Sequence, residues 1–195
     1  MKVADLQSVN SFPERLKAAT NLLHRELESL EVSANLAAGI LPEEQYLKYL
    51  EAMHDFAGSV EQKAFPLLEG RLDDLESRRK LHWLGKDLGR DPKSFNAIFD
   101  DSPWDEAFAF GVAYVLEGST LGGRYIRAKL LEQGRIPEQK MNFFDGYGNK
   151  TGIMWKHFLN SISAFATTAE RECGIMRGAN FAFRSIREHL RLQIA

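Results

Sequence analysis

Cysteine is nearly absent from this sequence, because Cys173 is the one cysteine in 195 residues. An internal disulfide needs a pair, so no disulfide framework is available, and this cysteine usage fits a reducing compartment. Long apolar runs are also missing, since none approaches the roughly 20 residues that span a bilayer. The sequence therefore predicts a cytoplasmic protein without a membrane anchor. The thiol of Cys173 has no evident activating neighbour and is expected to be buried or inert.

The sequence also lacks a large excess of positive or negative charge. The chain has 25 Lys and Arg against 27 Asp and Glu, a formal net charge of −2. This balance argues against a general nucleic-acid binder. A hydrophobic content of 44% and a charged content of 27% are typical of a globular protein. A chain of 195 residues fits one domain with a substantial core, so we expect residues 1–195 to form a single domain.

The alternation typical of strands is absent, whereas helical periodicity recurs along the chain. Residues 11–14 read Ser-Phe-Pro-Glu, a capping-box pattern that predicts a first helix ending near Leu30. The other expected helices cover residues 35–38, 41–68 with a break before Pro66, 72–88, 104–133 and 151–192. Residues 134–149 are expected to form a loop, and Gly174 and Gly178 to bend the last helix. These patterns predict an all-α fold.

Three glycines lie within six residues of the expected 104–133 helix, at Gly118, Gly122 and Gly123. Each glycine in a helix interior weakens the helix by about 0.8–1 kcal/mol relative to alanine. Gly118 and Gly122 are four residues apart, so they share one face, which presents bare backbone. Such a face suits a close helix contact, a kink or a flat ligand, and the glycines alone do not choose among these.

His24 lies beside the apolar stripe of the first expected helix, one turn after Thr20 and one turn before Glu28. A histidine in this position is either a packing residue or a metal ligand. Glu28 favours the second interpretation, because a carboxylate that binds one imidazole nitrogen makes the other a better donor to a metal. Lys17 is two turns earlier, near the same face, and can reach an anionic group.

Three motifs together resemble a known family. The first is Leu-Lys-Ala-Ala-Thr at residues 16–20, with His24 and Glu28 following. The second is Glu-Gly-Ser-Thr-Leu-Gly-Gly at residues 117–123. The third is Phe-Phe-Asp-Gly-Tyr-Gly at residues 143–148, followed by Trp-Lys-His-Phe at residues 155–158. In this order and at these separations, they resemble the bacterial haem oxygenases.

The resemblance implies a helical haem-oxygenase-like bundle that holds haem (iron protoporphyrin IX) as both substrate and cofactor. His24 is the implied iron ligand, and Gly118 and Ser119 are the implied catalytic positions on the opposite helix. The remaining implied haem-binding residues are Lys17, Thr20, Glu28, Gly118, Gly122, Gly123, Phe144, Trp155, Lys156, Phe158 and Phe183. Phe144, Trp155, Phe158 and Phe183 are equally compatible with an ordinary core.

The resemblance also implies the reaction: ring opening of haem to biliverdin, CO and ferrous iron, with O2 and electrons from an external reductase or ferredoxin. The protein is then expected to be a monomer or a weak homodimer. Two alternatives stay open. One is a non-catalytic haem-binding or haem-sensing protein, and the other is a helical enzyme of similar fold acting on thiamin-like or quinone-precursor substrates. The second needs an activated cysteine, for which Cys173 has no evident partner.

Some positions depart from the family pattern. Ser119 stands where some members carry an aspartate, so it is expected either to hold a water or only to bend the helix. His54 occupies the position of a distal tyrosine in other members, and we expect it to face solvent rather than join a polar network. The basic segment 75–90 is expected to be a solvated helix face that can dock an acidic redox partner.

Overall fold

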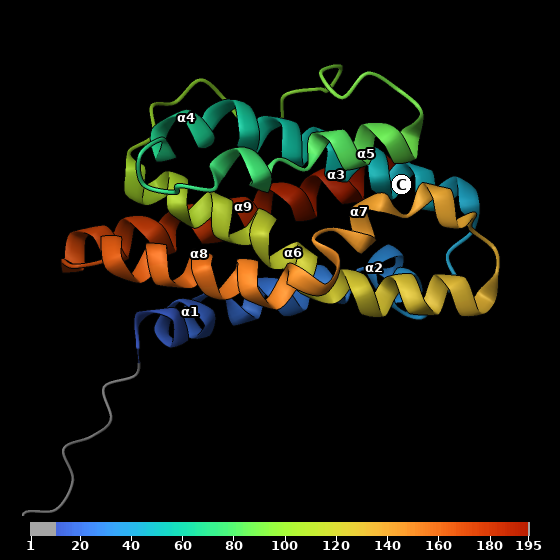
Figure 1. The fold of residues 1–195 in the computed structure, drawn as a ribbon, viewed down its shortest axis with the longest axis horizontal. Coiled ribbons are helices and arrows are strands. Elements are labelled where there is room, and N and C mark those ends of the chain that lie inside the picture. Colours follow the sequence, from blue (N-terminus) through green and yellow to red (C-terminus); the bar gives the residue numbers. More distant parts are fainter. Residues whose placement is uncertain (1–10, 195) are drawn as a thin grey trace, which may run out of the picture.

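The computed structural model describes residues 11–194, and it contains helices and connecting turns but no strand within that range (Figure 1). The first half of the described chain comprises α1 (Phe12–Glu28), α2 (Glu31–Ala37), α3 (Glu43–Lys63), α4 (Phe65–Leu68), η1 (Leu75–Arg78) and α5 (Leu81–Leu88). The second half comprises α6 (Glu106–Gln133), η2 (Glu138–Lys140), α7 (Asn142–Asp145), η3 (Gly148–Lys150), α8 (Thr151–Phe165) and α9 (Ala169–Ile194). The all-α prediction is confirmed. None of the helices in this range is long and apolar enough to cross a membrane.

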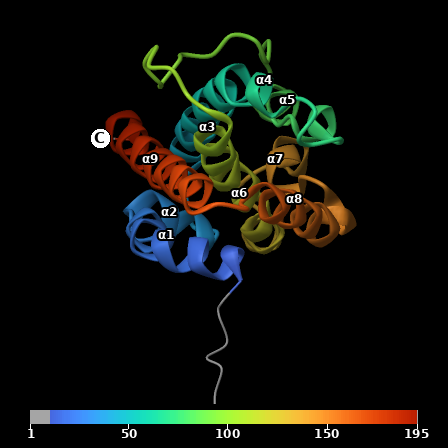
Figure 2. The same cartoon turned by 90° about the vertical axis from the view of Figure 1, so that its left-hand side faces the viewer.

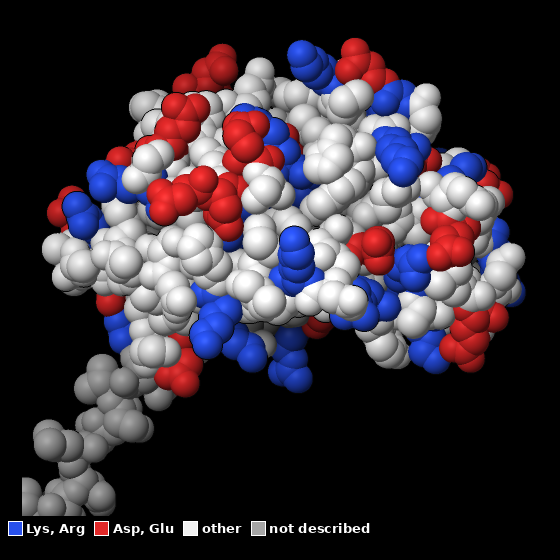
Figure 3. Space-filling model, in the orientation of Figure 1, with Lys and Arg blue, Asp and Glu red and all other residues white. Residues whose placement is uncertain are grey.

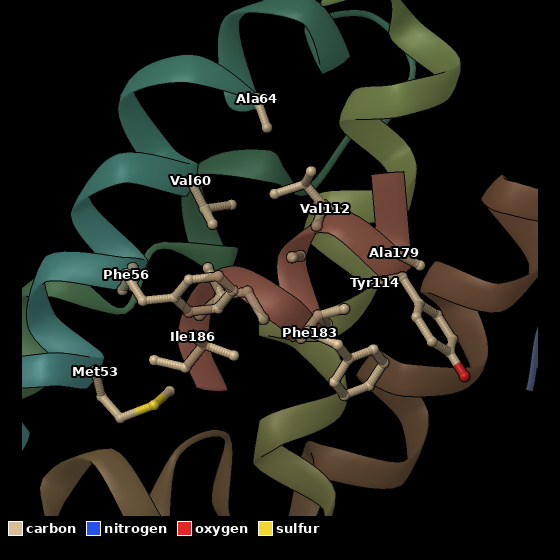
Figure 4. Packing of buried hydrophobic residues seen from close by; sticks show 14 of the residues in the cluster. Met53, Phe56, Val60, Ala64, Val112, Tyr114, Ala179, Phe183 and Ile186 are labelled. Carbon is tan, nitrogen blue, oxygen red and sulfur yellow. The ribbon is translucent and has the colours of Figure 1, made fainter. Parts of the chain in front are cut away.

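Helix α6 forms the centre of the fold, with α3, α8, α9 and α1 around it (Figure 2). Residues 107, 109–117 and 120 of α6 are all buried, as the apolar run 107–116 predicts. The sticks in Figure 4 show Met53, Phe56 and Val60 of α3 on one side of the core, and Tyr114 and Phe183 on another. The core therefore holds α6 in place along its N-terminal half, up to the start of the glycine run.

Helices α6 and α9 pack closely because glycines remove side chains from their contact. A Cβ atom on Gly111 would lie 2.0 Å from the carbonyl oxygen of Ile175, and one on Gly178 would lie 2.1 Å from that of Phe108. A Cβ on Gly174 would lie 2.7 Å from the Ala107 Cβ. Helix α9 continues through Gly174 and Gly178, where the sequence predicts bends. These glycines permit close helix packing instead.

Two boundaries differ from the sequence prediction because side chains distant in sequence bind the backbone. The expected 72–88 helix is broken between η1 and α5, where the Glu61 carboxylate accepts hydrogen bonds from the backbone N–H groups of Lys80 and Leu81. This interaction satisfies free N–H groups at the start of α5. Likewise, residues 134–149 contain short helices rather than only loop: Asp87 accepts hydrogen bonds from the N–H groups of Asn142 and Phe143, each at 2.8 Å.

The remaining boundaries follow the sequence more closely. The Ser11 N–H donates to the Glu14 carboxylate at 2.7 Å, which satisfies one half of the predicted capping box. The break before Pro66 is present, between α3 and α4. The predicted 151–192 helix is divided into α8 and α9 by residues 166–168.

Candidate functional site

Helices α1 and α6 come together at Thr20 and Tyr114, whose side chains interact. Both residues are buried, and the Thr20 hydroxyl also donates to the Leu16 carbonyl oxygen at 2.9 Å. Burial raises the pKa of the Tyr114 phenol, so the phenol stays neutral. The two helices run in the same direction (Figure 1). His24 and Gly118 each lie one turn beyond this contact on their own helix, so the contact brings the two motifs to the same level of the fold.

The imidazole of His24 is half exposed, with 52% of the side chain accessible. Its Nδ1 atom lies 3.5 Å from the Glu28 carboxylate, which leaves Nε2 directed away from that partner. The ring of Phe183 packs edge-on against the imidazole, with ring centroids 5.6 Å apart and planes at 81°. Glu28 and Phe183 therefore restrict the imidazole from two sides, and one nitrogen remains available to a ligand.

The glycine run of α6 has two different faces. A Cβ on Gly122 would have no atom within 4 Å, and a Cβ on Gly118 would meet only the Trp155 ring, at 3.8 Å. By contrast, a Cβ on Gly123 would lie 2.7 Å from the Phe144 carbonyl oxygen. Gly118 and Gly122 thus leave bare backbone beside open space, whereas Gly123 permits a backbone-to-backbone contact with α7.

The aromatic residues predicted from the sequence separate into two groups. Trp155 is half buried, and its ring packs on Tyr114 at 5.4 Å between centroids, next to Gly118. Phe158 has no accessible surface and packs on Phe110 and the Arg78 guanidinium. Phe144 is also buried, against Tyr46 and other rings of α3 and α7. Trp155 and Phe183 therefore border the open region, while Phe144 and Phe158 support it from within the core.

The polar residues of the predicted site have simpler surroundings. The Ser119 hydroxyl is half buried and donates to the Leu116 carbonyl at 2.7 Å, so its oxygen keeps lone pairs that can accept a further hydrogen bond. Lys17 on α1 and Lys156 on α8 are both exposed. Their ammonium groups are free to reach anionic groups at the edge of the site.

Three expectations about other residues are wrong. His54 is fully buried rather than facing solvent: its Nδ1 lies 3.2 Å from an Arg90 nitrogen, and burial together with the Arg90 charge lowers the pKa of the imidazole. Cys173 is exposed rather than buried, and its inertness stays a prediction. The basic segment 75–90 is not a uniformly solvated face, because Arg78 and Lys80 have no accessible surface. Acidic and basic side chains are intermixed on the face shown in Figure 3.

The partner of these two buried cations is Glu117, which precedes the first glycine of the run. Glu117 is buried, and its carboxylate accepts hydrogen bonds from Arg78 at 2.6 Å, from Lys80, and from the Tyr147 phenol at 2.9 Å. Sequence reasoning missed this arrangement. The sequence did contain one indication of it, a carboxylate at the end of an apolar helical run. Such a group is rarely buried without a charged partner, so a basic partner could have been predicted.

Comparison with known proteins identifies the family of this chain. The sequence model of the family described as heme oxygenase matches residues 10–191, which is most of the chain. This chain belongs to the heme oxygenase family. It is therefore a haem-degrading oxidoreductase, with haem as substrate and prosthetic group, O2 as co-substrate and a reductase as the source of electrons. Family membership does not favour the alternative of a haem carrier that leaves haem intact.

Solved structures of two bacterial heme oxygenases share the fold. The NO- and CO-bound enzyme from Neisseria meningitidis is 24% identical, with a TM-score of 0.77 over 94% of this chain and 92% of the other. The enzyme from Leptospira interrogans is 16% identical, with a TM-score of 0.73 over 93% of this chain and 98% of the other. No curated protein sequence matches this chain. The likeness to these two structures supports the all-α fold.

Proposed function

We propose that this protein opens the haem ring to biliverdin, CO and ferrous iron, with haem held between α1 and the glycine run of α6. The observation that carries the proposal is the level shared by His24 on α1 and the bare backbone of Gly118 on α6, each one turn beyond the Thr20–Tyr114 contact, with Gly122 one turn further along the same face. The open space beside Gly122 fits a flat ligand, since a side chain at that position would occupy it. A neutral imidazole is a suitable axial donor to haem iron.

Each group on the α1 side has a distinct part in this proposal. His24 would hold the iron of bound haem through Nε2, and Glu28 would accept a hydrogen bond from Nδ1–H, which fixes the tautomer and strengthens the donor. Phe183 fixes the orientation of the imidazole. Lys17 and Lys156 attract the propionates of haem from the solvent edge. Thr20 contributes indirectly, because its side-chain interaction with Tyr114 sets the separation of the two helices.

Bound haem supplies both the iron at which O2 is activated and the ring that is oxidised. The α6 side carries no acidic or basic side chain at Gly118 and Gly122, so these two positions would supply no proton to the oxygen chemistry of bound haem. Ser119 can accept a hydrogen bond from a water at this face through its free lone pair. Trp155 covers Gly118 and excludes solvent from that end. We assign Gly118 and Ser119 to the catalytic face on these grounds.

The described residues 11–194 form one helical domain, and the protein acts in the cytoplasm as a monomer or weak homodimer. The electron donor is a separate reductase or ferredoxin. The residues of the basic segment 75–90 do not form its docking surface as a set, because Arg78 and Lys80 are buried.

Titration with haemin tests the proposed activity. We expect a Soret band that reports a histidine-ligated complex, and then loss of this band with growth of a broad red absorbance when ferredoxin, its reductase and NADPH are added in air. The same mixture without O2 should keep the Soret band. A band that persists in air with reductant would instead indicate a haem carrier, and absence of any haem complex would reject the proposed site.

A further inference from the structure

A cluster of charged and polar groups, in which Arg78, Lys80 and Glu117 are buried, adjoins the start of the glycine run. The Glu117 cluster consists of Asp74, Arg78, Lys80, Glu117 and Tyr147. Arg78 donates to Glu117 at 2.6 Å and to both oxygens of Asp74, at 2.6 and 2.7 Å. The Lys80 ammonium donates to Glu117 and, at 3.0 Å, to the Tyr147 oxygen, and the Tyr147 hydroxyl donates to Glu117 at 2.9 Å. Each charged group in the cluster is therefore paired.

This cluster joins segments that are distant in the sequence. Glu117 is on α6, Arg78 ends η1, Lys80 precedes α5, and Tyr147 lies between α7 and η3. Arg78 also donates to the Met154 carbonyl oxygen of α8 at 3.3 Å. Burying several charges is seldom the most stable way to fill a core, because desolvation offsets much of the attraction. Net stabilisation of the fold therefore does not by itself account for charged groups at this position.

The glycine run that follows Glu117 has few restraints of its own. Glycine leaves the backbone more conformational freedom than any other residue. On the open face, Gly118 is near Trp155 only and Gly122 has no neighbour. At the far end of the run, Gly123 is held by the backbone of Phe144. Phe144 contacts Gly123, and Tyr147 contacts Glu117. The short segment 144–147 therefore contacts α6 at both ends of the run.

We propose that Glu117 is a positioning residue, which holds the Gly118–Gly123 backbone at a fixed place over the haem and so determines which ring-edge carbon is cleaved. This inference rests on the proposed function, since it takes the glycine run as the wall opposite His24. Arg78, Lys80 and Tyr147 act through Glu117 and touch no reacting atom. A shift of the wall by a fraction of an ångström changes which edge of the ring is confined.

Two conservative variants and one control test the proposal. Glu117→Gln keeps the size of the side chain and removes its charge. Tyr147→Phe removes one hydroxyl and keeps the ring, which packs against Trp83. The matched control is Arg71→Gln, because Arg71 forms a bidentate pair with Glu106 at the other end of α6, where both side chains are exposed. Each of the three variants alters a polar interaction between α6 and a neighbouring segment.

The first measurement is amide hydrogen exchange of the haem-free protein, in peptides that cover residues 117–123. We expect both cluster variants to exchange about tenfold faster in this segment than the wild type, and Arg71→Gln to exchange at the wild-type rate there. The second measurement is the ratio of biliverdin isomers after turnover, separated by chromatography. We expect this ratio to shift by about two- to tenfold in the cluster variants and to stay unchanged in the control.

The outcomes separate the two proposals. An unchanged isomer ratio in Tyr147→Phe, with haem bound and turned over, overturns the positioning role whether or not exchange increases. If Glu117→Gln fails to fold, Tyr147→Phe decides the question alone. A wild-type protein that binds no haem, or leaves it intact, rejects the proposed function instead. In that case, unchanged exchange in Tyr147→Phe also rejects the restraint of the glycine run.

Discussion

Gly123 and Phe144 are in direct backbone contact, since a Cβ on Gly123 would lie 2.7 Å from the Phe144 carbonyl oxygen. The adjacent Gly122 has no atom within 4 Å of the same position. Neighbouring glycines in one helix therefore serve different purposes. Gly123 fixes α7 against α6, and Gly122 leaves space for a ligand. This difference leads to the first prediction.

Gly123→Ala should destabilise the protein by about 1–3 kcal/mol, because the added methyl group collides with backbone that has little freedom to move. Gly122→Leu should fold normally and bind haem at least about tenfold more weakly, because its side chain occupies the open face. Urea unfolding measures the first effect and haemin titration the second. Gly152→Leu is the matched control for the leucine variant: it adds the same side chain in α8, also with no atom within 4 Å of its Cβ, and should bind haem normally. Equal affinity of the two leucine variants would contradict the assigned face.

His24→Ala should abolish the spectrum of the histidine-ligated complex, because His24 is the proposed iron ligand and lies at the level of Gly118. The control is His157→Ala. The side chain of His157 is 49% exposed and its Nδ1 lies 3.1 Å from Asp74, so it resembles His24 in exposure and in having a carboxylate partner. The absorption spectrum of each variant with haemin measures the result. A wild-type spectrum in His24→Ala would remove His24 as the iron ligand.

Lys80→Met should destabilise the protein by about 3 kcal/mol, because it removes a buried partner of the Glu117 carboxylate. Lys86→Met makes the same change at an exposed position of α5 and should alter the stability by less than about 0.5 kcal/mol. Chemical unfolding of the two variants measures the difference. Equal stability would mean that the Lys80 contact makes no net contribution to folding.

Asp74→Asn should destabilise the protein at neutral pH and much less in acid. Burial opposes ionisation of Asp74, but the hydrogen bonds and charges of Arg78 and His157 outweigh it, so the pKa of the carboxyl group is lowered. A carboxyl group with a depressed native pKa contributes stability above its ordinary pKa of about 3.9, and this contribution is lost as the pH falls through the native value.

Urea unfolding at pH 7 and at about pH 3 tests this dependence. We expect a deficit of about 1–3 kcal/mol for Asp74→Asn at pH 7, which shrinks toward the lower pH. The exposed neighbour provides the control, and Asp73→Asn should match the wild type at both values. If Asp74→Asn lowers the stability equally at the two pH values, loss of the ionised carboxylate is not the cause of the destabilisation.

The sequence by itself determined the helical class, the start of α1, the break before Pro66 and the alignment of His24 with Glu28. These features depend on interactions within one or two helical turns, and the spacing of residues in the sequence predicts such interactions directly. It also indicated the glycine run, because three glycines in a helix interior conflict with helix propensity. The family resemblance then gave the function.

The tertiary structure alone decided the roles of the individual glycines and charges. Gly111, Gly123, Gly174 and Gly178 allow close packing while Gly122 faces open space, and only the neighbouring elements distinguish these cases. Arg78 and Lys80 follow a basic pattern that predicts exposure, yet Glu117 provides a buried partner from 39 and 37 residues away. A charge enters the core only when a partner is present there, and that partner is fixed by the packing of helices rather than by local sequence.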